Sequence, residues 1–355
     1  MTFTGDFTYE SRPGRVVLRP GAALTATPAE AEHLGLRRLL VVCGSRGEAV
    51  ARAVADALGD SCAGLHAEAR MHVPVEDADR AVAVARAVGA DGVVAVGGGS
   101  SVGLGKAIAL RTGLPLIAVP STYSGSEMTP VWGLTEAGVK RTGRDPKVQP
   151  RSVVYDPELT VSLPVPLTVT SGVNALAHAV EALYAPDTSP LIALMAQEGV
   201  RAMAEALPLL AAHPEDLDAR GRALYAAWLC GSCLGSTTMG LHHKLCHVLG
   251  GTFGLPHAET HTVVLPYALA YNAPAVPGAL SALSRALDAD DPSRALWELA
   301  GRLGAPRSLA ELGLKETDLA EAAVQVAGQP YANPRPVTAD GVRAVLQAAF
   351  EGRRP

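Results

Sequence analysis

Short apolar runs alternate with helical segments through the first half of this 355-residue chain, and this alternation constrains its fold most strongly. The apolar runs are Arg38–Cys43, 61–66, 91–96 and 115–119, and helical patterns follow up to residue 58, at 75–88 and at 102–110. Runs that are apolar at every position are typical of strands in a parallel sheet that helices cover on both faces. We therefore expect an α/β dinucleotide-binding domain with a Rossmann-like parallel sheet over residues 1–160.

The character of the sequence changes near Pro150. Tyr155–Pro157 and Leu163–Pro166 contain prolines that are typical of turns and linkers. Ala- and Leu-rich helical patterns follow at 171–184, 190–210, 216–235 and 281–303. These patterns predict an all-helical substrate or catalytic domain over residues 161–355, and the chain is long enough for two domains.

Composition excludes several classes of partner. The net charge of −5 and the pI near 6.1 do not favour nucleic acid or an anionic membrane surface. Every apolar run is shorter than the roughly 18 residues of a transmembrane helix, and Met1–Glu10 has no signal-peptide pattern. The five cysteines are odd in number and have no framework spacing, so we expect reduced thiols and a cytoplasmic protein.

A glycine-rich loop after the run at 91–96 predicts a phosphate-binding site. Three glycines and two serines precede a helix, and the free N–H groups of a helix start bind phosphate well (Gly97, Gly98, Gly99, Ser100 and Ser101). The next apolar run ends in a polar loop able to contact the rest of a dinucleotide (Ser121, Thr122, Tyr123, Ser126 and Met128). Ser45 and Arg46 stand where an acid would normally bind the ribose, so NADPH is acceptable beside NADH.

The second half carries a group of histidines with an unusual fourth member. Asn174 and His178 are four residues apart and share a helix face, and His243 and His257 follow fourteen residues apart. Three imidazoles and an aspartate would form a divalent metal site, but a neutral amide is a poor ligand. The group therefore indicates a metal site that has lost its anionic member.

In this order, these motifs resemble the iron-containing alcohol dehydrogenase superfamily, and within it the maleylacetate reductase branch. The similarity covers nearly the whole chain and rests on segments 97–107, 120–133, 142–146, 171–181, 242–247 and 255–261. The metal-dependent relatives have an aspartate and three histidines as ligands, at positions that correspond to Asn174, His178, His243 and His257. They also tend to carry an acid where this chain has Gly103. The resemblance implies a fold like that of dehydroquinate synthase and a homodimer active in the breakdown of aromatic compounds.

The resemblance also implies a reaction that needs no metal. Hydride addition to a carbon–carbon double bond conjugated to a ketone produces an enolate, which hydrogen bonds and a nearby cation can stabilise. We expect His178 and His243 to stabilise the enolate or donate its proton, with His257 and Asn174 beside them. Lys244 is the expected anchor for a dicarboxylate substrate.

Three other functions stay open at this point. One is a metal-dependent alcohol dehydrogenase in which three histidines hold iron or zinc. Another is a zinc-dependent synthase of the dehydroquinate type, and the third is a cofactor-binding module without activity. A different unsaturated keto acid is an alternative substrate.

Overall fold

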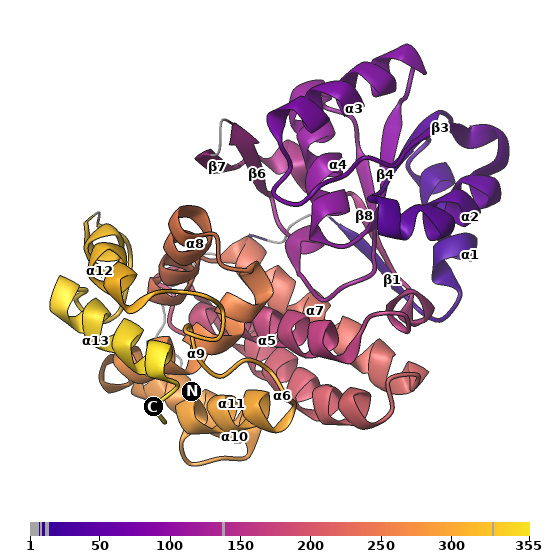
Figure 1. Ribbon diagram of the computed structural model, residues 1–355. Helices are drawn as coiled ribbons and strands as arrows, with labels where there is room; N and C mark the ends of the chain where they lie inside the picture. Colours follow the sequence, from indigo (N-terminus) through magenta and orange to yellow (C-terminus); the bar gives the residue numbers. More distant parts are fainter. Residues whose placement is uncertain (1–6, 8, 11–13, 137–138, 329) are drawn as a thin grey trace. The chain divides into compact units, whose positions relative to one another are not determined.

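The computed structural model describes residues 7, 9–10, 14–136, 139–328 and 330–355, and most of Met1–Glu10 lies outside these ranges. The chain divides into two compact units (Figure 1). The α/β unit contains Ser11–Leu163 and Glu215–Leu224, and the helical unit contains Pro164–Pro214 and Tyr225–Pro355. The boundary expected at 160/161 is three residues from the observed division, and Glu215–Leu224 groups with the α/β unit by contacts.

The α/β unit is built on a parallel sheet of six strands in the order β1-β8-β5-β4-β2-β3. The strands are β1 (Arg15–Leu18), β2 (Leu39–Val42), β3 (Cys62–His66), β4 (Gly92–Gly97), β5 (Leu116–Pro120) and β8 (Ser152–Tyr155). The predicted α/β fold is confirmed, and the four predicted strands are shifted by at most one residue at either end. The sequence interpretation did not include β1 and β8, which are only four residues long.

Alternate strand residues face the two covering layers of helices. Leu39, Val41, Val94 and Ile117 belong to one buried cluster with α1 (Ala22–His33) and α2 (Glu48–Leu58). Leu40, Val42, Val93 and Leu116 belong to the other, with α3 (Val75–Ala87) and α4 (Gly99–Thr112). This two-residue period explains why the strands are apolar throughout: both faces are buried.

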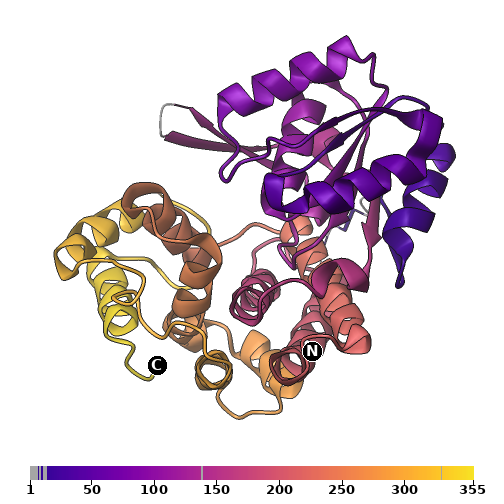
Figure 2. The same cartoon turned by 45° about the vertical axis from the view of Figure 1, so that its right-hand side comes forward.

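An antiparallel hairpin of β6 (Val131–Glu136) and β7 (Val139–Arg144) forms a separate two-stranded sheet. It extends from the α/β unit beyond the main sheet (Figure 2). Its strands pair from Val131 with Arg144 to Glu136 with Val139. The sequence interpretation did not include this hairpin, because its residues mix charged, small and apolar types.

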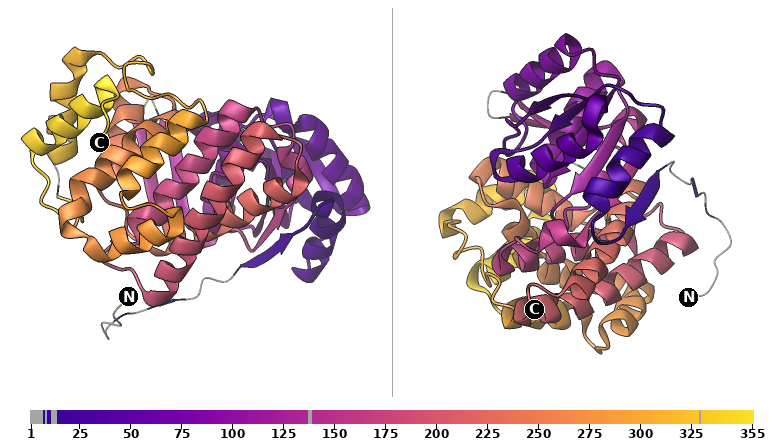
Figure 3. Two further views of the ribbon diagram at one scale, coloured as in Figure 1. Left: turned by 90° about the horizontal axis from the view of Figure 1, so that it is seen from below. Right: turned by 90° about the vertical axis from the view of Figure 1, so that its right-hand side faces the viewer.

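The helical unit contains long helices that pack on one another (Figure 3). They are α5 (Val165–Ala182), α6 (Pro190–Ala212), α8 (Leu241–Phe253), α9 (His257–Asn272), α10 (Pro277–Leu287), α11 (Pro292–Arg302), α12 (Leu319–Ala327) and α13 (Ala339–Glu351). Helix α7 (Leu217–Ser236) contributes residues to both units. A core of leucine, valine and alanine joins α8, α9, α12 and α13. The predicted all-helical second half is therefore confirmed.

Two predicted features of the second half need correction. The single helix expected over 281–303 is two helices, because Asp288 adopts a left-handed conformation with φ of 49° and ends α10. Asp291 then caps α11 by accepting the N–H of Arg294. The expected linker at Leu163–Pro166 instead starts α5, whose first turn contains Pro166. No helix among the described residues is both long and apolar enough to cross a membrane.

Candidate active site

The glycine-rich loop lies at the carboxyl end of β4, beside the loop that follows β2. From β2 the chain continues to β3 on one side, whereas β4 leads to β5 on the other side. Ligands of open α/β sheets bind at such a reversal of strand order. The loop that contains Ser45 and Arg46 and the loop at 97–101 therefore border one site, as expected for a dinucleotide.

The backbone of this loop requires glycine. Gly97 has a φ of 130°, and a Cβ there would lie 2.6 Å from Ser101 Oγ. Helix α4 begins at Gly99, earlier than the predicted residue 102, with Gly98 as a cap that has no side chain. The first N–H groups of α4 therefore lie within the glycine run, where they can bind a pyrophosphate.

The predicted cofactor residues differ in exposure. Those with part of the side chain or backbone exposed are Gly98, Gly99, Ser100, Ser121, Thr122, Ser126, Met128, Ser45 and Arg46. Ser101 is buried, and its Oγ accepts the N–H of Gly44 at 3.2 Å, so it joins the two loops. Tyr123 is fully buried, and its hydroxyl accepts a bond from Arg220 Nη1 at 3.0 Å. These two buried side chains therefore hold the cofactor loops in place.

A buried lysine supports the loop between β5 and β6. Lys106 Nζ on α4 donates to the carbonyl oxygens of Ser126 (2.5 Å) and Val131 (2.8 Å) and to Thr129 Oγ1 (2.9 Å). Burial lowers the pKa of Lys106 to about 7, against an opposing effect of Glu127. Burial also raises the pKa of Glu127, whose carboxylate accepts the Tyr155 hydroxyl at 2.9 Å. This buried pair fixes the loop that contains five of the predicted cofactor residues.

In the helical unit, three helices bring the predicted histidines together. His178 on α5 and His243 on α8 are both buried, and His178 Nδ1 lies 2.9 Å from His243 Nε2. His257 is the first residue of α9, exposed, with its ring centroid 4.3 Å from that of His261. His261 in turn lies 5.0 Å from the ring of His243. The cluster therefore extends from a buried pair to an exposed edge.

Glu181 lies behind the histidine pair. Its carboxylate is fully buried and accepts a hydrogen bond from His243 Nδ1 at 2.7 Å. It also accepts the backbone N–H groups of Gly240 (3.0 Å), His242 (2.8 Å) and His243 (3.3 Å) at the start of α8. These are the N–H groups that a helix leaves without partners, and α8 has no capping side chain of its own. Glu181 therefore fixes both the helix start and the His243 ring.

A second buried pair lies beside the first. His242 Nε2 is 3.0 Å from His261 Nδ1, and Cys246 Sγ is 3.7 Å from His242 Nε2. These three residues have the spacing of a possible metal site, the one such group in the described part of the chain. Burial, with smaller effects of neighbouring imidazoles, lowers the pKa of both histidines well below the usual range. The two rings are therefore neutral and bond directly to each other.

The remaining predicted residues lie around this core. Lys244 is half-buried, with its Nζ 5.9 Å from the centre of the Tyr331 ring. Asn174, 4% exposed, is one turn before His178 on α5. Its Oδ1 is buried and has no hydrogen-bond partner among the described residues. The structure thus brings Asn174, His178, His243 and Lys244 to the same group of helices as His257.

The donor set does not fit the metal of the metal-dependent relatives. Position 174 provides a neutral amide, and His243 Nε2 faces another imidazole at 2.9 Å. The carboxylate of Glu181 is already bonded to four N–H groups. A divalent cation at these positions would therefore have no anionic ligand and would have to break the histidine pair.

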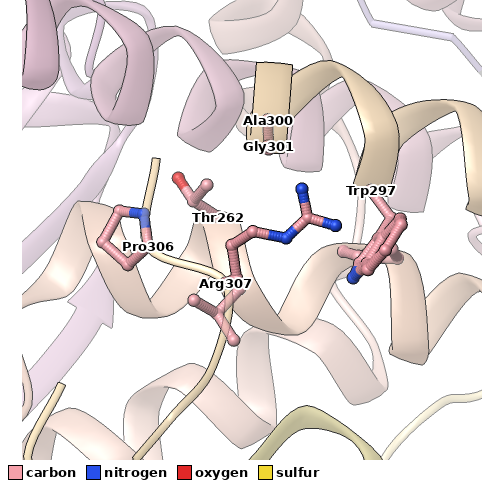
Figure 4. A pocket seen from close by; sticks show the side chains of 8 residues that line it. Thr262, Trp297, Ala300, Gly301, Pro306 and Arg307 are labelled. Carbon is pink, nitrogen blue, oxygen red and sulfur yellow. The ribbon is translucent and has the colours of Figure 1, made fainter. Parts of the chain in front are cut away.

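Two small hollows in the helical unit are lined by residues other than the predicted site residues. One, of about 10 Å³, lies where Arg307 crosses the Trp297 ring at 3.7 Å from its centre, beside Thr262 (Figure 4). That volume is about that of one water, so it cannot hold an organic substrate. The other, of about 150 Å³, is lined by residues of the segment 327–337, among them Tyr331, Asn333 and Arg335.

Sequence reasoning missed Glu181 and Lys106 as site residues, although both lie in segments used for the family resemblance. Glu181 follows His178 by three residues and Asn174 by seven, so all three share one face of α5. Lys106 is a charged residue in an otherwise apolar helix, Val102–Leu110. In both residues, a charged side chain stands on a helix face that is otherwise apolar. This pattern could have identified Glu181 and Lys106 from the sequence.

Comparison with known proteins places the chain among enzymes of one family. A model described as iron-containing alcohol dehydrogenase matches residues 13–157, and one for the C-terminal part of the same family matches residues 168–350. A maleylacetate reductase of Sphingobium indicum is 52% identical over 350 residues, with 99% of each chain covered.

Solved structures agree. The maleylacetate reductase of Rhizobium sp. strain MTP-10005 superposes with a TM-score of 0.95 at 51% identity, over 99% of each chain. The sulfoacetaldehyde reductase of Bifidobacterium kashiwanohense, solved with NAD⁺, has a TM-score of 0.89 at 25% identity, covering 97% of this chain and 99% of its own. The similarity therefore includes an enzyme with a bound nicotinamide cofactor.

Proposed function

Because the chain belongs to the maleylacetate reductase branch of the iron-containing alcohol dehydrogenase family, we propose that it reduces the carbon–carbon double bond of maleylacetate with NADH or NADPH. The product is 3-oxoadipate. The observation that carries the proposal is the histidine cluster, assembled at the family's ligand positions but with Asn174 in place of the carboxylate. The enzyme is an oxidoreductase that uses a nicotinamide cofactor.

The chemistry explains how protein groups replace a metal. Bound NAD(P)H would supply a hydride to the alkene carbon remote from the ketone, and negative charge would spread over the resulting enolate. The hydrogen-bonded pair of His178 and His243 stabilises that charge, and one of the two imidazoles supplies the proton that completes the product. Preorganised donors of this kind commonly contribute several kcal/mol to a reaction.

The substrate is a dianion, so binding it requires positive or N–H-bearing groups. Lys244 and the exposed His257 are the predicted residues at the accessible side of the cluster. Asn174 contributes a neutral side chain where a carboxylate would repel the substrate. We assign substrate binding to Lys244 and His257, and the chemistry to His178 and His243.

The cofactor is assigned to the α/β unit. Its pyrophosphate binds the glycine run Gly97–Gly99 with Ser100, and the loop from Ser121 to Met128 contacts the remainder. Arg46 is exposed directly after β2, without an acid at the neighbouring position, which supports use of NADPH as well as NADH. Steady-state assays with both cofactors test this; turnover with NADH alone would reject it.

The decisive experiment follows oxidation of NAD(P)H at 340 nm with maleylacetate, before and after dialysis against a chelator. We expect unchanged turnover, since no ligand carboxylate stands at position 174. Loss of turnover that iron or zinc restores would instead support a metal-dependent alcohol dehydrogenase. No turnover with maleylacetate, but reduction of a related unsaturated keto acid, would keep the reaction and change the substrate. We also propose a homodimer, which light scattering tests.

A further inference from the structure

We propose that Glu181 is the positioning residue of this site: it holds His243 in one tautomer and so makes His178 the imidazole that delivers the proton. The inference rests on the proposed function and deepens it, because two histidines were equal candidates for proton delivery. It is carried by a chain of hydrogen bonds within the helical unit, from Glu181 through His243 to His178.

The protonation of His243 follows from its partner. Three backbone N–H groups and one ring nitrogen converge on the two oxygens of Glu181, an arrangement that suits an ionised carboxylate, which only accepts. His243 Nδ1 therefore carries a proton and donates it to Glu181. In a neutral imidazole the other nitrogen, Nε2, then accepts, so His178 Nδ1 is the donor in the 2.9 Å bond between the rings.

This assignment fixes the direction of the relay. Because His178 Nδ1 is directed at His243, the relay assigns delivery of the substrate's proton to the other ring nitrogen, His178 Nε2. His243 cannot serve as the outer donor, since both of its nitrogens are bonded within the relay. Glu181 acts on the substrate only through the two rings and is therefore a positioning residue.

The carboxylate is itself held rigidly. It is fully buried, and the N–H groups it accepts belong to the first turn of α8, the turn that carries His243. A Cβ at Gly240 would lie 3.2 Å from Glu181 Oε1, so the close approach of the helix start uses a glycine. Helix α8 and the ring of His243 therefore share one anchor, which limits movement of the relay.

The other groups that face the relay come from α8 and α9. The rings of His242, His247 and His261 have centroids 5.3, 6.2 and 5.0 Å from that of His243, and His261 lies 6.3 Å from His178. Cys246 on α8 is close enough to Glu181 for the carboxylate to help raise the pKa of its buried thiol. The carboxylate that bonds to the His243 ring is that of Glu181.

The step balances as follows. NAD(P)H gives a hydride to the alkene carbon and becomes NAD(P)⁺, while the double bond shifts to form the enolate. A protonated His178, stabilised through neutral His243 by the charge of Glu181, gives its Nε2 proton to the enolate carbon. His178 becomes neutral, keeps its Nδ1 proton and recovers the other from water after product release.

The test compares Glu181→Gln with a matched control at the same helix start. Asn333 Oδ1 accepts the N–H of Leu241 at 3.2 Å and Asn272 Nδ2 at 3.1 Å, so Asn333→Ala removes a cap of α8 but none of the bonds that join Glu181, His243 and His178. We expect Glu181→Gln to lower kcat at least about 100-fold with KM for maleylacetate changed by less than about threefold. Asn333→Ala should keep kcat within about threefold. Equal losses in both variants would show a structural role and overturn the proposal.

A second measurement does not depend on the substrate. Nitrogen NMR of the wild-type protein labelled at histidine distinguishes the two neutral tautomers, with His243→Asn used to assign the signal. We expect His243 as the Nδ1–H form in the wild type. An Nε2–H form would overturn the relay even if maleylacetate is reduced. Conversely, failure to reduce maleylacetate together with the expected tautomer would reject the proposed function alone.

Glu181→Asp covers the case in which the glutamine variant does not fold. The shorter carboxylate keeps the charge and can still accept from the helix start, so we expect partial recovery of kcat relative to Glu181→Gln and the Nδ1–H tautomer retained. An aspartate variant that folds, keeps this tautomer and is as inactive as His243→Asn would contradict the proposal.

Discussion

The cofactor loop of the α/β unit and the histidine cluster of the helical unit each depend on a buried ionisable side chain, but the two side chains have opposite roles. Lys106 donates to carbonyl oxygens and a hydroxyl of the loop that follows β5. Glu181 accepts N–H groups of the first turn of α8 and, in addition, a ring nitrogen of His243. Lys106 thus orders only a loop, whereas Glu181 orders a helix start and, in our proposal, also sets the tautomer of His243.

This difference predicts how the two regions respond to substitution. Loss of a loop support should weaken cofactor binding, because the loop must be ordered at a cost in entropy when the ligand binds. Loss of a relay member should lower the rate of the chemical step with little effect on binding, because its contribution is made mainly in the transition state.

The largest expected effect is at the relay. We expect His243→Ala to lower kcat about 1,000-fold, since acid–base catalysis of this kind contributes about 10² to 10⁴. The dissociation constant of NADPH, measured by fluorescence titration, should stay within about twofold. His213→Ala is the control, because that histidine is exposed at the end of α6. Unchanged turnover in His243→Ala would remove the ring from the mechanism.

A smaller effect, of the other kind, is expected at the loop. Lys106→Met keeps the length of the buried stem but leaves the carbonyl groups of Ser126 and Val131 without a donor. We expect the dissociation constant of NADPH to rise about tenfold and the free energy of unfolding to fall by about 1–3 kcal/mol, with kcat at saturation nearly unchanged. Lys147→Met, at an exposed lysine, is the control. A large loss of kcat in Lys106→Met with normal cofactor affinity would contradict the expected difference between the cofactor loop and the histidine cluster.

The smallest expected effect is a pH dependence of stability that comes from Lys106. Its pKa in the folded protein is about 7, below the usual 10.5, so between these values the unfolded chain binds the proton that the folded protein has lost. Stability from this group therefore rises with pH across that window, by up to about 1.4 kcal/mol per pH unit. Glu127, with a raised pKa, acts in the opposite direction above pH 4.5.

Urea unfolding of the wild type and Lys106→Met at pH 7, 8 and 9 measures this contribution. The difference in free energy of unfolding between the wild type and the variant should grow as pH rises. A difference that is constant, or that shrinks with pH, would show that Lys106 stays charged throughout.

The cofactor region was the more predictable from sequence, because backbone geometry builds it. Gly97 must be glycine at its φ of 130°, and the run of three glycines after a buried strand reveals that need directly. Four of the six strands, β2 to β5, were likewise evident from apolar runs. The hairpin β6–β7 was not, since its residues follow no strong alternation.

The histidine region was predictable only in part. The family pattern identified His178, His243 and His257, but nothing in the sequence shows that His178 and His243 bond to each other, because they are 65 residues apart. The pairing of His242 with His261 and the burial of Cys246 also depend on how α8 packs on α9. Contacts between side chains of separate helices are determined by how the helices pack. Local sequence patterns carry no information about this packing.

The start of α8 has no capping side chain of its own. Its first N–H groups are accepted by Glu181, about 60 residues earlier, and by Asn333, about 90 residues later in the chain. A polypeptide still emerging from the ribosome lacks part of the partner set of this turn until residue 333 has been synthesised and has docked, and α13 joins the core around α8 later still. Catalytic competence should therefore be acquired last. Premature stop codons that spare every histidine but remove residues 333–355 should give inactive protein, because they also remove α13 from the core that holds α8 and α9.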